Sequence, residues 1–326
     1  MGNNPQTAAM NTQAKTIADS IILGCWQLDD RSWKSLTEED IERTIGTYQA
    51  WGVRIFDTAD IYGRSERLLG KCLKGRTDCK IYTKAVFFNG LPTPKQIQSK
   101  VENSLRNLQR DYLDCLQVHW HNPQLDFAET FKVLNRYLEQ GKIHQLGVTN
   151  FDTLMLKKAL EYAPIQTHQV QYSLIDRRVE KSMQELCVEN NIQLLCYGPL
   201  AGGFLSDKFL GVKSPPAEGE HARGFYYSNM IAKHGDWQGV QTLLSKMAEI
   251  GKKYQFSVSQ VALNWLIQQP GVGAMISGLT ENRQQIQKNM ESLQPLIRSE
   301  DIQELSRCSD ELFEQVGDIY SYERGV

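Results

Sequence analysis

The chain has 326 residues, of which 41% are hydrophobic and 23% charged, and its formal net charge is −2. These proportions are those of an ordinary globular protein. The 36 basic and 38 acidic side chains are nearly balanced and form no dense basic run that could follow a phosphate backbone, so we expect no nucleic-acid partner. No apolar run approaches the roughly 20 residues that cross a bilayer, so we expect no membrane partner either.

Residues 1–16 lack the charged start and apolar middle of a secretory signal. We interpret them as a flexible N-terminal tail that precedes a single domain over residues 17–326. The seven cysteines are scattered along the chain and contain no CxxC pair. An odd number of isolated cysteines is typical of free thiols in a reducing compartment, which predicts a cytoplasmic protein.

From residue 20 to about 310, short apolar runs alternate with segments of helical period. Each run is nearly continuous in apolar residues, which is typical of strands that are covered on both faces. The helical segments place apolar residues three or four positions apart, as at Ile97, Val101 and Leu105. The predicted strands are 20–24, 53–56, 80–84, 113–118, 143–149, 167–171, 192–197 and 273–277.

Helix start signals agree with this alternation. Thr37 precedes three acidic residues, Thr93 precedes a proline, and Ser299 precedes Glu300 and Asp301. Strict alternation of eight strand–helix units predicts a parallel sheet, and eight units favour closure into a (β/α)₈ TIM barrel. No GxGxxG follows the first strand, which disfavours a dinucleotide-binding open sheet.

One segment, 203–239, has no clear period and is rich in glycine, with two adjacent prolines. It follows the seventh strand, and loops at the carboxyl ends of barrel strands face the active site. A long loop at this position is typical of a lid over a bound ligand, and a variable surface insertion is the alternative.

Polar residues end consecutive strands of the predicted barrel. Asp57, Lys84, His119 and Asn150 follow or end the second to fifth strands, and Tyr62 lies five residues beyond Asp57. In a barrel, such positions meet at the catalytic face. We therefore expect a carboxylate, a phenol, an ammonium and an imidazole to converge there.

This set of groups suits carbonyl reduction. A phenol has an ordinary pKa near 10, and a neighbouring ammonium lowers it, so Lys84 would make Tyr62 a better general acid. Asp57 would hold Lys84 in place and keep it charged. His119 would donate a hydrogen bond to the carbonyl oxygen. Since no side chain supplies a hydride, the reaction requires a nicotinamide cofactor.

Motifs over nearly the whole chain resemble the aldo-keto reductase superfamily. They are DTADIYG (57–63), the lysine of YTKA (82–85), LQVHW (116–120), GVTNF (147–151), QVQYS (169–173), YGPLAGGFL (197–205), SQVALNWL (259–266) and ISGLTENRQQIQKN (276–289). The resemblance implies an NADP(H)-dependent reductase of aldehydes or ketones, acting as a monomer or weak homo-oligomer without a metal. It also implies a catalytic tetrad in which Tyr62 is the acid and base, completed by Asp57, Lys84 and His119.

By the same resemblance, ten residues match positions that bind the cofactor, from its nicotinamide to its adenine end. They are Thr149, Asn150, Gln169, Tyr197, Leu200, Gly202, Gly278, Arg283, Gln285 and Asn289. Thr149 stands where the family more often has serine, and its hydroxyl can serve the same purpose. Near the adenine end, Thr280 is expected to cap a helix whose N-terminus favours phosphate.

The adenine segment departs from the family pattern by one extra residue. Glu281 falls near the expected basic position, and Arg283 is the nearest candidate for the 2′-phosphate of NADP(H). If Arg283 points away, Glu281 would favour NAD(H), so NAD is the alternative cofactor.

Aromatic residues near the strand ends are candidates for substrate binding. Trp26, Phe87 and Trp120 are expected to line the pocket, with Phe88 adding apolar wall; core or rim packing is the alternative for each. Two rival functions remain open at this point. One is a nucleotide-binding regulatory subunit of the same fold with little turnover, and the other is a metal-dependent hydrolase built on His119 and His121.

Overall fold

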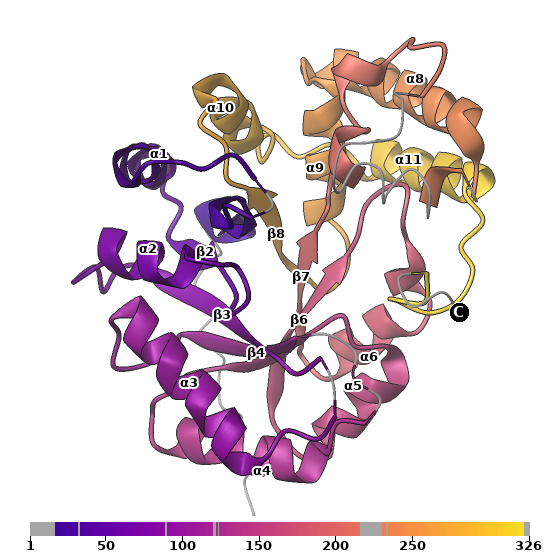
Figure 1. Cartoon of the computed structure of the whole chain (residues 1–326). Coiled ribbons are helices and arrows are strands. Elements are labelled where there is room, and N and C mark those ends of the chain that lie inside the picture. The colour runs from indigo at the N-terminus through magenta and orange to yellow at the C-terminus, as the bar shows by residue number, and fades with distance from the viewer. Residues whose placement is uncertain are drawn as a thin grey trace, which may run out of the picture.

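Eight parallel strands, each followed by helical structure, surround a common axis (Figure 1). The strands are β1 (Ile21–Gly24), β2 (Ile55–Asp57), β3 (Lys80–Val86), β4 (Cys115–His119), β5 (Leu146–Thr149), β6 (Ile165–Gln171), β7 (Gln193–Tyr197) and β8 (Val272–Gly278). They pair in chain order, and β1 pairs with β8 to close the barrel. The computed structural model describes residues 17–322 except 32, 89, 120, 121, 123, 216–229 and 233.

The predicted (β/α)₈ TIM barrel is therefore confirmed. Each observed strand overlaps the segment that predicts it, and both faces of the strands are covered by side chains or helices. The largest difference is at β5, which begins at Leu146 rather than 143. Leu113 and Ile143, the first residues of two predicted strands, form only an isolated bridge with each other. β4 and β5 therefore begin later than predicted.

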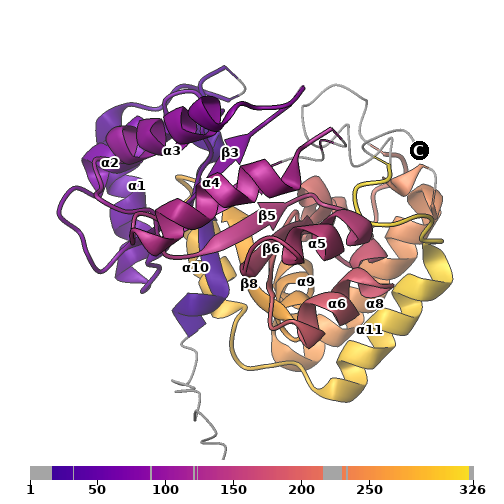
Figure 2. The ribbon, with the colours of Figure 1, turned by 90° about the horizontal axis from the view of Figure 1, so that it is seen from below.

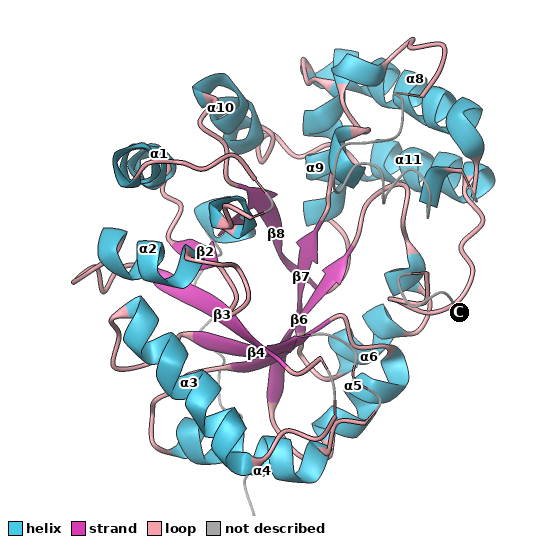
Figure 3. Cartoon of the chain, viewed as in Figure 1, coloured by secondary structure: helices cyan, strands magenta, loops and turns pink. Residues whose placement is uncertain are grey.

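Helices form the outer layer around the barrel (Figure 3). They are α1 (Glu38–Ala50), α2 (Ser65–Cys72), α3 (Pro94–Leu108), α4 (Phe127–Glu139), α5 (Thr153–Leu160), α6 (Met183–Glu189), α8 (Asp236–Tyr254), α9 (Val258–Ile267), α10 (Arg283–Glu291) and α11 (Ser299–Leu312). Within the described part of the chain, none of them combines the length and the apolar character needed to span a membrane.

Two of the predicted helix caps are present in the structure, and two others are wrong. The hydroxyl of Thr37 accepts a hydrogen bond from Asp40 N, and Thr93 forms a capping box with Gln96. The cap of α10 is Asn282 rather than Thr280. The cap of α11 is Arg298, which makes no side-chain capping bond, so Ser299 is already the first helical residue.

The inside of the barrel is apolar at one end and polar at the other. Six buried side chains fill its apolar part: Ile22, Tyr82, Cys115, Leu195, Ala274 and Ile276. Most of them lie before the carboxyl ends of their strands, and the polar residues Asp57, Lys84 and His119 lie nearer those ends. The apolar cluster therefore closes the barrel beneath the polar groups.

The loop after β7 contains two short 3-10 helices, Ala201–Gly203 and Asp207–Phe209. The structure describes this loop to residue 215 and again from 230, apart from 233; the rest of the predicted 203–239 loop lies outside the described residues. The predicted end is too late, because α8 already begins at Asp236. The predicted N-terminal tail, 1–16, also lies outside the described residues.

Residues 313–322 leave α11 and contact loops at the carboxyl ends of the strands (Figure 2). The carboxylate of Asp318 accepts a hydrogen bond of 2.8 Å from Thr153 N at the start of α5. The ring of Tyr322 lies 3.9 Å from the Arg178 guanidinium carbon and stacks on His234, with 4.6 Å between the ring centroids. This segment thus joins the loops after β5, β6 and β7.

Candidate active site

Three neighbouring strands place polar side chains at one end of the barrel. Asp57 is the last residue of β2, Lys84 lies in β3, and His119 is the last residue of β4. Tyr62 lies on the turn after β2, where Tyr62 N donates to Ala59 O at 3.0 Å. The four residues of the predicted tetrad therefore come together, through the parallel order of the strands.

Lys84 and Asp57 form a buried ion pair. The distance from Lys84 Nζ to Asp57 Oδ2 is 2.6 Å, and the side chains are 0% and 5% exposed. Lys84 also donates to Thr58 O at 2.8 Å, and Gln169 Nε2 donates to Asp57 Oδ1 at 2.8 Å. Burial lowers the pKa of Lys84, but Asp57 and the neighbouring phenol outweigh it, so the pKa is raised and the ammonium stays charged.

The Tyr62 ring lies between Lys84, His119 and Trp26. Lys84 Nζ is 5.2 Å from its ring centroid, and the His119 ring lies edge-on at 6.5 Å between centroids. Burial raises the pKa of Tyr62, and the lowering by Lys84 is smaller. The ammonium acts in the predicted direction, but the pKa of Tyr62 is not lowered overall, because desolvation of the phenolate is the larger effect.

His119 is a neutral imidazole in this site. Burial, and then the positive charge of Lys84, hold its pKa well below the ordinary value. A neutral imidazole carries one N–H, so His119 can donate a single hydrogen bond toward a bound group without bringing a second positive charge. This fits the predicted role of orienting a carbonyl oxygen.

The buried histidines predict how stability depends on pH. Burial lowers the pKa of His168, in β6, to about 3. The unfolded chain takes up a proton below pH 6.5 that the folded protein excludes, so stability falls as pH falls. Between pH 8 and pH 5, His168 is expected to remove about 2 kcal/mol from the free energy of unfolding, and His119 acts with the same sign.

Urea unfolding of the parent and His168→Gln at both pH values measures this effect. Glutamine can still accept the 3.3 Å hydrogen bond that His168 Nε2 receives from Phe151 N. The variant should lose less stability than the parent on acidification, and His144→Gln, at an exposed histidine, is the control. An equal loss in parent and His168→Gln would contradict the prediction.

The predicted nicotinamide-binding residues lie at the ends of β5, β6 and β7. Thr149 Oγ1 donates to Gln117 Oε1 at 3.2 Å, and Tyr197 Oη donates to Asn150 Oδ1 at 3.0 Å. Asn150 has a left-handed backbone with φ of 58°, a conformation that asparagine adopts more readily than most other residues. Gln169 uses its amide nitrogen on Asp57, which leaves its carbonyl oxygen to accept from a carboxamide. These donors and acceptors fit a nicotinamide carboxamide.

Gln117 was not predicted as a site residue. It lies fully buried in β4, beside Lys84 in β3, and its carbonyl oxygen fixes the direction of the Thr149 hydroxyl. The sequence holds a signal for it, because side chains two positions apart on a strand point to the same face and Gln117 precedes His119 by two. Thr58, whose carbonyl accepts from Lys84, gives no such signal.

The predicted pyrophosphate segment is a tight turn after β7. Ala201 N donates to Gly198 O at 2.9 Å and Gly203 N donates to Leu200 O at 2.8 Å. Gly202, with φ of 67°, adopts a left-handed conformation that favours glycine. The turn therefore places Leu200 and Gly202 directly after the carboxyl end of β7.

The predicted adenine end follows β8. Gly278 ends that strand, and Arg283 and Gln285 are exposed in the first turn of α10. Asn289 is only 7% exposed, and its amide donates to Ser277 Oγ at 3.2 Å. Gln285 and Asn289 thus share a helix face but differ in exposure.

The cap of α10 also bears on the predicted phosphate site. Asn282 Oδ1 accepts from Gln284 N at 3.1 Å and from Gln285 N at 3.2 Å. Thr280 Oγ1 accepts from Asn282 N instead of capping the helix. The cap thus occupies two N–H groups that a phosphate would otherwise use.

The predicted substrate residues have different environments. The Trp26 side chain is 38% exposed and lies 6.4 Å from the Tyr62 ring, between centroids, with Trp33 beside it at 5.3 Å. Phe87 is 6% exposed and packs in the main core, which is the alternative considered for it, whereas Phe88 is 57% exposed. Trp120 lies outside the described residues.

The rival hydrolase function would need a metal centre. Among the residues that it describes, no group of three or more His, Cys, Asp or Glu side chains could hold a metal ion. His121, the second histidine of the rival metal motif, lies outside that part of the chain.

A model of the Aldo/keto reductase family matches residues 20–310. The chain belongs to the aldo/keto reductase family. It is 30% identical over 272 residues to the aldo-keto reductase YhdN of Bacillus subtilis (strain 168), covering 80% of this chain and 81% of that protein. It is 28% identical over 300 residues to the NADH-specific methylglyoxal reductase of Escherichia coli (strain K12), covering 83% and 88%.

A solved structure shares the fold. The aldo-keto reductase from Klebsiella pneumoniae in complex with NADPH aligns with a TM-score of 0.69 at 22% identity, over 91% of this chain and 95% of that chain. The resemblance of the sequence motifs to aldo/keto reductases is thus confirmed, and the family is one of oxidoreductases.

Proposed function

We propose that this aldo/keto reductase reduces an aldehyde or ketone to an alcohol with NADPH, and that Tyr62 is the proton donor. The observation that carries the proposal is the buried Lys84–Asp57 pair, 2.6 Å between Nζ and Oδ2, next to the phenol of Tyr62. The Lys84 ammonium therefore lies close to the Tyr62 phenol, which would lose its proton in the reaction. His119 lies on another side of the same ring.

The roles of the residues follow from their charges. When bound, NADPH supplies the hydride that reduces the carbonyl carbon. Tyr62 gives its proton to the carbonyl oxygen, Lys84 stabilises the phenolate that remains, and Asp57 holds Lys84. His119 donates a hydrogen bond that orients the carbonyl. Thr149, Asn150 and Gln169 would hold the carboxamide, and Tyr197 would lie against the nicotinamide ring.

The phenol of Tyr62 is protonated at neutral pH, as a proton donor must be. Burial keeps the phenol protonated, and a protonated phenol is the form that can deliver a proton. The reverse reaction needs the phenolate to accept a proton from an alcohol. Carbonyl reduction is thus the direction that needs no prior change in the protonation of Tyr62.

Turnover with a panel of small aldehydes and ketones tests the proposal. NADPH oxidation that depends on the carbonyl is expected, and the alcohol should form in equal amount. Tight NADPH binding with no turnover on any carbonyl would instead indicate a nucleotide-binding regulatory protein.

The preference for NADPH depends on Arg283. Arg283 is exposed on α10, and the K. pneumoniae structure contains NADPH, whereas the E. coli relative is NADH-specific. An arginine here can pair with the 2′-phosphate, which NADH lacks. Arg283→Ala is expected to weaken NADPH binding about tenfold and NADH binding little, as measured by tryptophan fluorescence titration.

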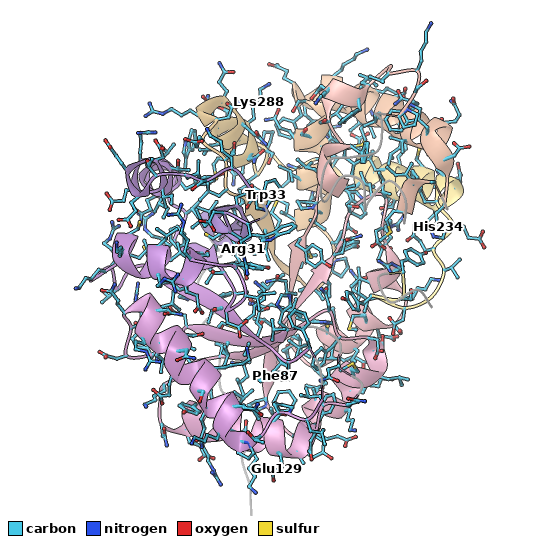
Figure 4. The ribbon with its side chains drawn as sticks, in the orientation of Figure 1. Arg31, Trp33, Phe87, Glu129, His234 and Lys288 are labelled. Atoms are coloured by element: carbon cyan, nitrogen blue, oxygen red, sulfur yellow. The ribbon has the colours of Figure 1, made fainter. Side chains whose placement is uncertain are left out.

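Lys288→Ala is the matched control, because Lys288 is an exposed cation on the same helix (Figure 4). It should leave both affinities unchanged. Equal weakening of NADPH and NADH by Arg283→Ala would remove Arg283 from the phosphate site. Tighter binding of NADH than NADPH by the parent would assign NAD(H) as the cofactor.

We also propose a cytoplasmic protein that is a monomer or weak homo-oligomer, acting on a small-molecule carbonyl. The seven cysteines, all of which lie among the described residues, form no disulfide, which fits a reducing compartment. The proposed catalytic groups all come from one chain, so the chemistry needs no second copy. Size-exclusion chromatography with light scattering measures the oligomeric state.

A further inference from the structure

We propose that Arg31 and Asp29 are positioning residues, which hold the turn that carries Tyr62 in its working place. The inference rests on the proposed function, because it assigns these residues to the proton donor of that reaction. Both come from the loop after β1, whereas Tyr62 follows β2. Neither residue touches the reacting atoms in this proposal; they act through the backbone on both sides of Tyr62.

The first observation is the pair itself. Arg31 Nε donates to Asp29 Oδ1 at 2.7 Å, and a terminal nitrogen of Arg31 donates to Asp29 Oδ2 at 2.8 Å. Arg31 N adds a bond of 3.2 Å to Asp29 Oδ1. Asp29 is 4% exposed, so the carboxylate is a fixed anchor for a guanidinium whose side chain remains 64% exposed.

The second observation is what the pair touches. The same terminal nitrogen of Arg31 donates to Ile61 O, the carbonyl that directly precedes Tyr62. On the other side of Tyr62, Gly63 has φ of +51°, and a Cβ there would come within 2.8 Å of Asp29 Oδ1 and 3.6 Å of Arg31 Nε. The pair therefore packs against the residues on both sides of the phenol-bearing position.

Tyr62 needs such support because no strand holds it. It lies in a turn, and its own backbone bonds, to Ala59 O and from Ser65 N, are local to that turn. Asp57, Lys84 and His119 are fixed by the barrel, so only the turn can change the distance between the phenol and Lys84. A displacement of about 1 Å at a reacting group can cost on the order of a hundredfold in rate.

Charge attraction alone does not explain an arginine here. Arg64 and Asp30 lie in the same region and form a second pair at 3.4 Å, so Arg31 sits among balanced charges and presents no net positive site for an anion. What distinguishes arginine is the planar fork, which can bind the carboxylate twice and still donate to a carbonyl. Lysine keeps the charge but has no fork, so Arg31→Lys isolates the geometry.

Arg31→Lys and Asp29→Asn are the test variants, and Arg76→Lys is the matched control. Arg76 also binds an aspartate two residues away through two hydrogen bonds, of 3.0 and 3.1 Å to Asp78. This pair precedes β3, so it lies at the amino end of that strand and not at the end that holds Lys84. Both test variants should lower kcat about tenfold or more, with NADPH affinity within about twofold of the parent. The melting temperature should change little, because Arg31 is largely exposed.

A solvent isotope effect separates positioning from general loosening. If the phenol is misplaced, proton transfer limits turnover more strongly, so the ratio of kcat in H₂O to kcat in D₂O should rise in Arg31→Lys and stay unchanged in Arg76→Lys. Parent-like kcat in both test variants would overturn the inference. So would a fall in kcat that is matched by an equal loss of NADPH binding or that leaves the isotope effect unchanged. Absence of carbonyl turnover by the parent would instead refute the proposed function.

Discussion

Tyr62→Phe is expected to lower kcat for carbonyl reduction by about 10²- to 10⁴-fold while NADPH binds with parental affinity. The substitution removes only the phenol oxygen, so the ring that packs among Trp26, Lys84 and His119 stays in place. Steady-state NADPH oxidation gives the rate, and tryptophan fluorescence titration gives the affinity.

Tyr112→Phe is the control for this prediction. Tyr112 stacks on His144 at 4.1 Å between centroids, in the segment that precedes β4 rather than at the carboxyl ends of the strands. It should keep parental kcat. Turnover by Tyr62→Phe at the parental rate would show that another group supplies the proton.

Asp57→Asn is expected to reduce both stability and activity, because it leaves the buried ammonium of Lys84 without its counter-charge. Lys84 is 0% exposed, and loss of one partner of a buried ion pair typically costs about 3–5 kcal/mol. Urea unfolding at pH 7 measures the free energy of unfolding. Asp78→Asn removes the carboxylate from two ion pairs, with Arg76 and Arg54, whose side chains are 40–49% exposed, and should cost less than about 1 kcal/mol.

The pH dependence of the Asp57→Asn deficit tests its cause. Without Asp57, burial pushes the pKa of Lys84 below its unfolded value, so the penalty is full at pH 7 and shrinks as pH rises toward about 10. A deficit that is the same at pH 7 and pH 10 would point to lost hydrogen bonds rather than to an uncompensated charge.

The barrel could be predicted from the sequence because its strands are local apolar runs. Both faces of each strand are covered, so apolar runs in the sequence coincide with buried strands, as in β1 (IILG) and β7 (QLLCY); β6 (IQTHQVQ) is buried although most of its residues are polar. Parallel order then places Asp57, Lys84 and His119 at one end without any knowledge of contacts. Only the ends of elements differ, as at β5 and at the start of α8.

Features that depend on a balance of effects or on distant loops could not be predicted. The rise in the Tyr62 pKa reflects how far burial exceeds the effect of Lys84, and sequence does not give burial of a turn residue. Phe87 follows a strand whether it faces the core or the pocket. The contact of Arg31 with Ile61 joins two loops 30 residues apart, and no pattern of residue types marks it.

The contacts of residues 313–322 have a consequence for truncation of the chain. Phe313 and Ile319 are each 1% exposed in the main hydrophobic core, and Asp318 and Tyr322 contact residues that follow β5, β6 and β7. Removal of this segment would therefore expose part of the core and release the loops at the catalytic end at the same time.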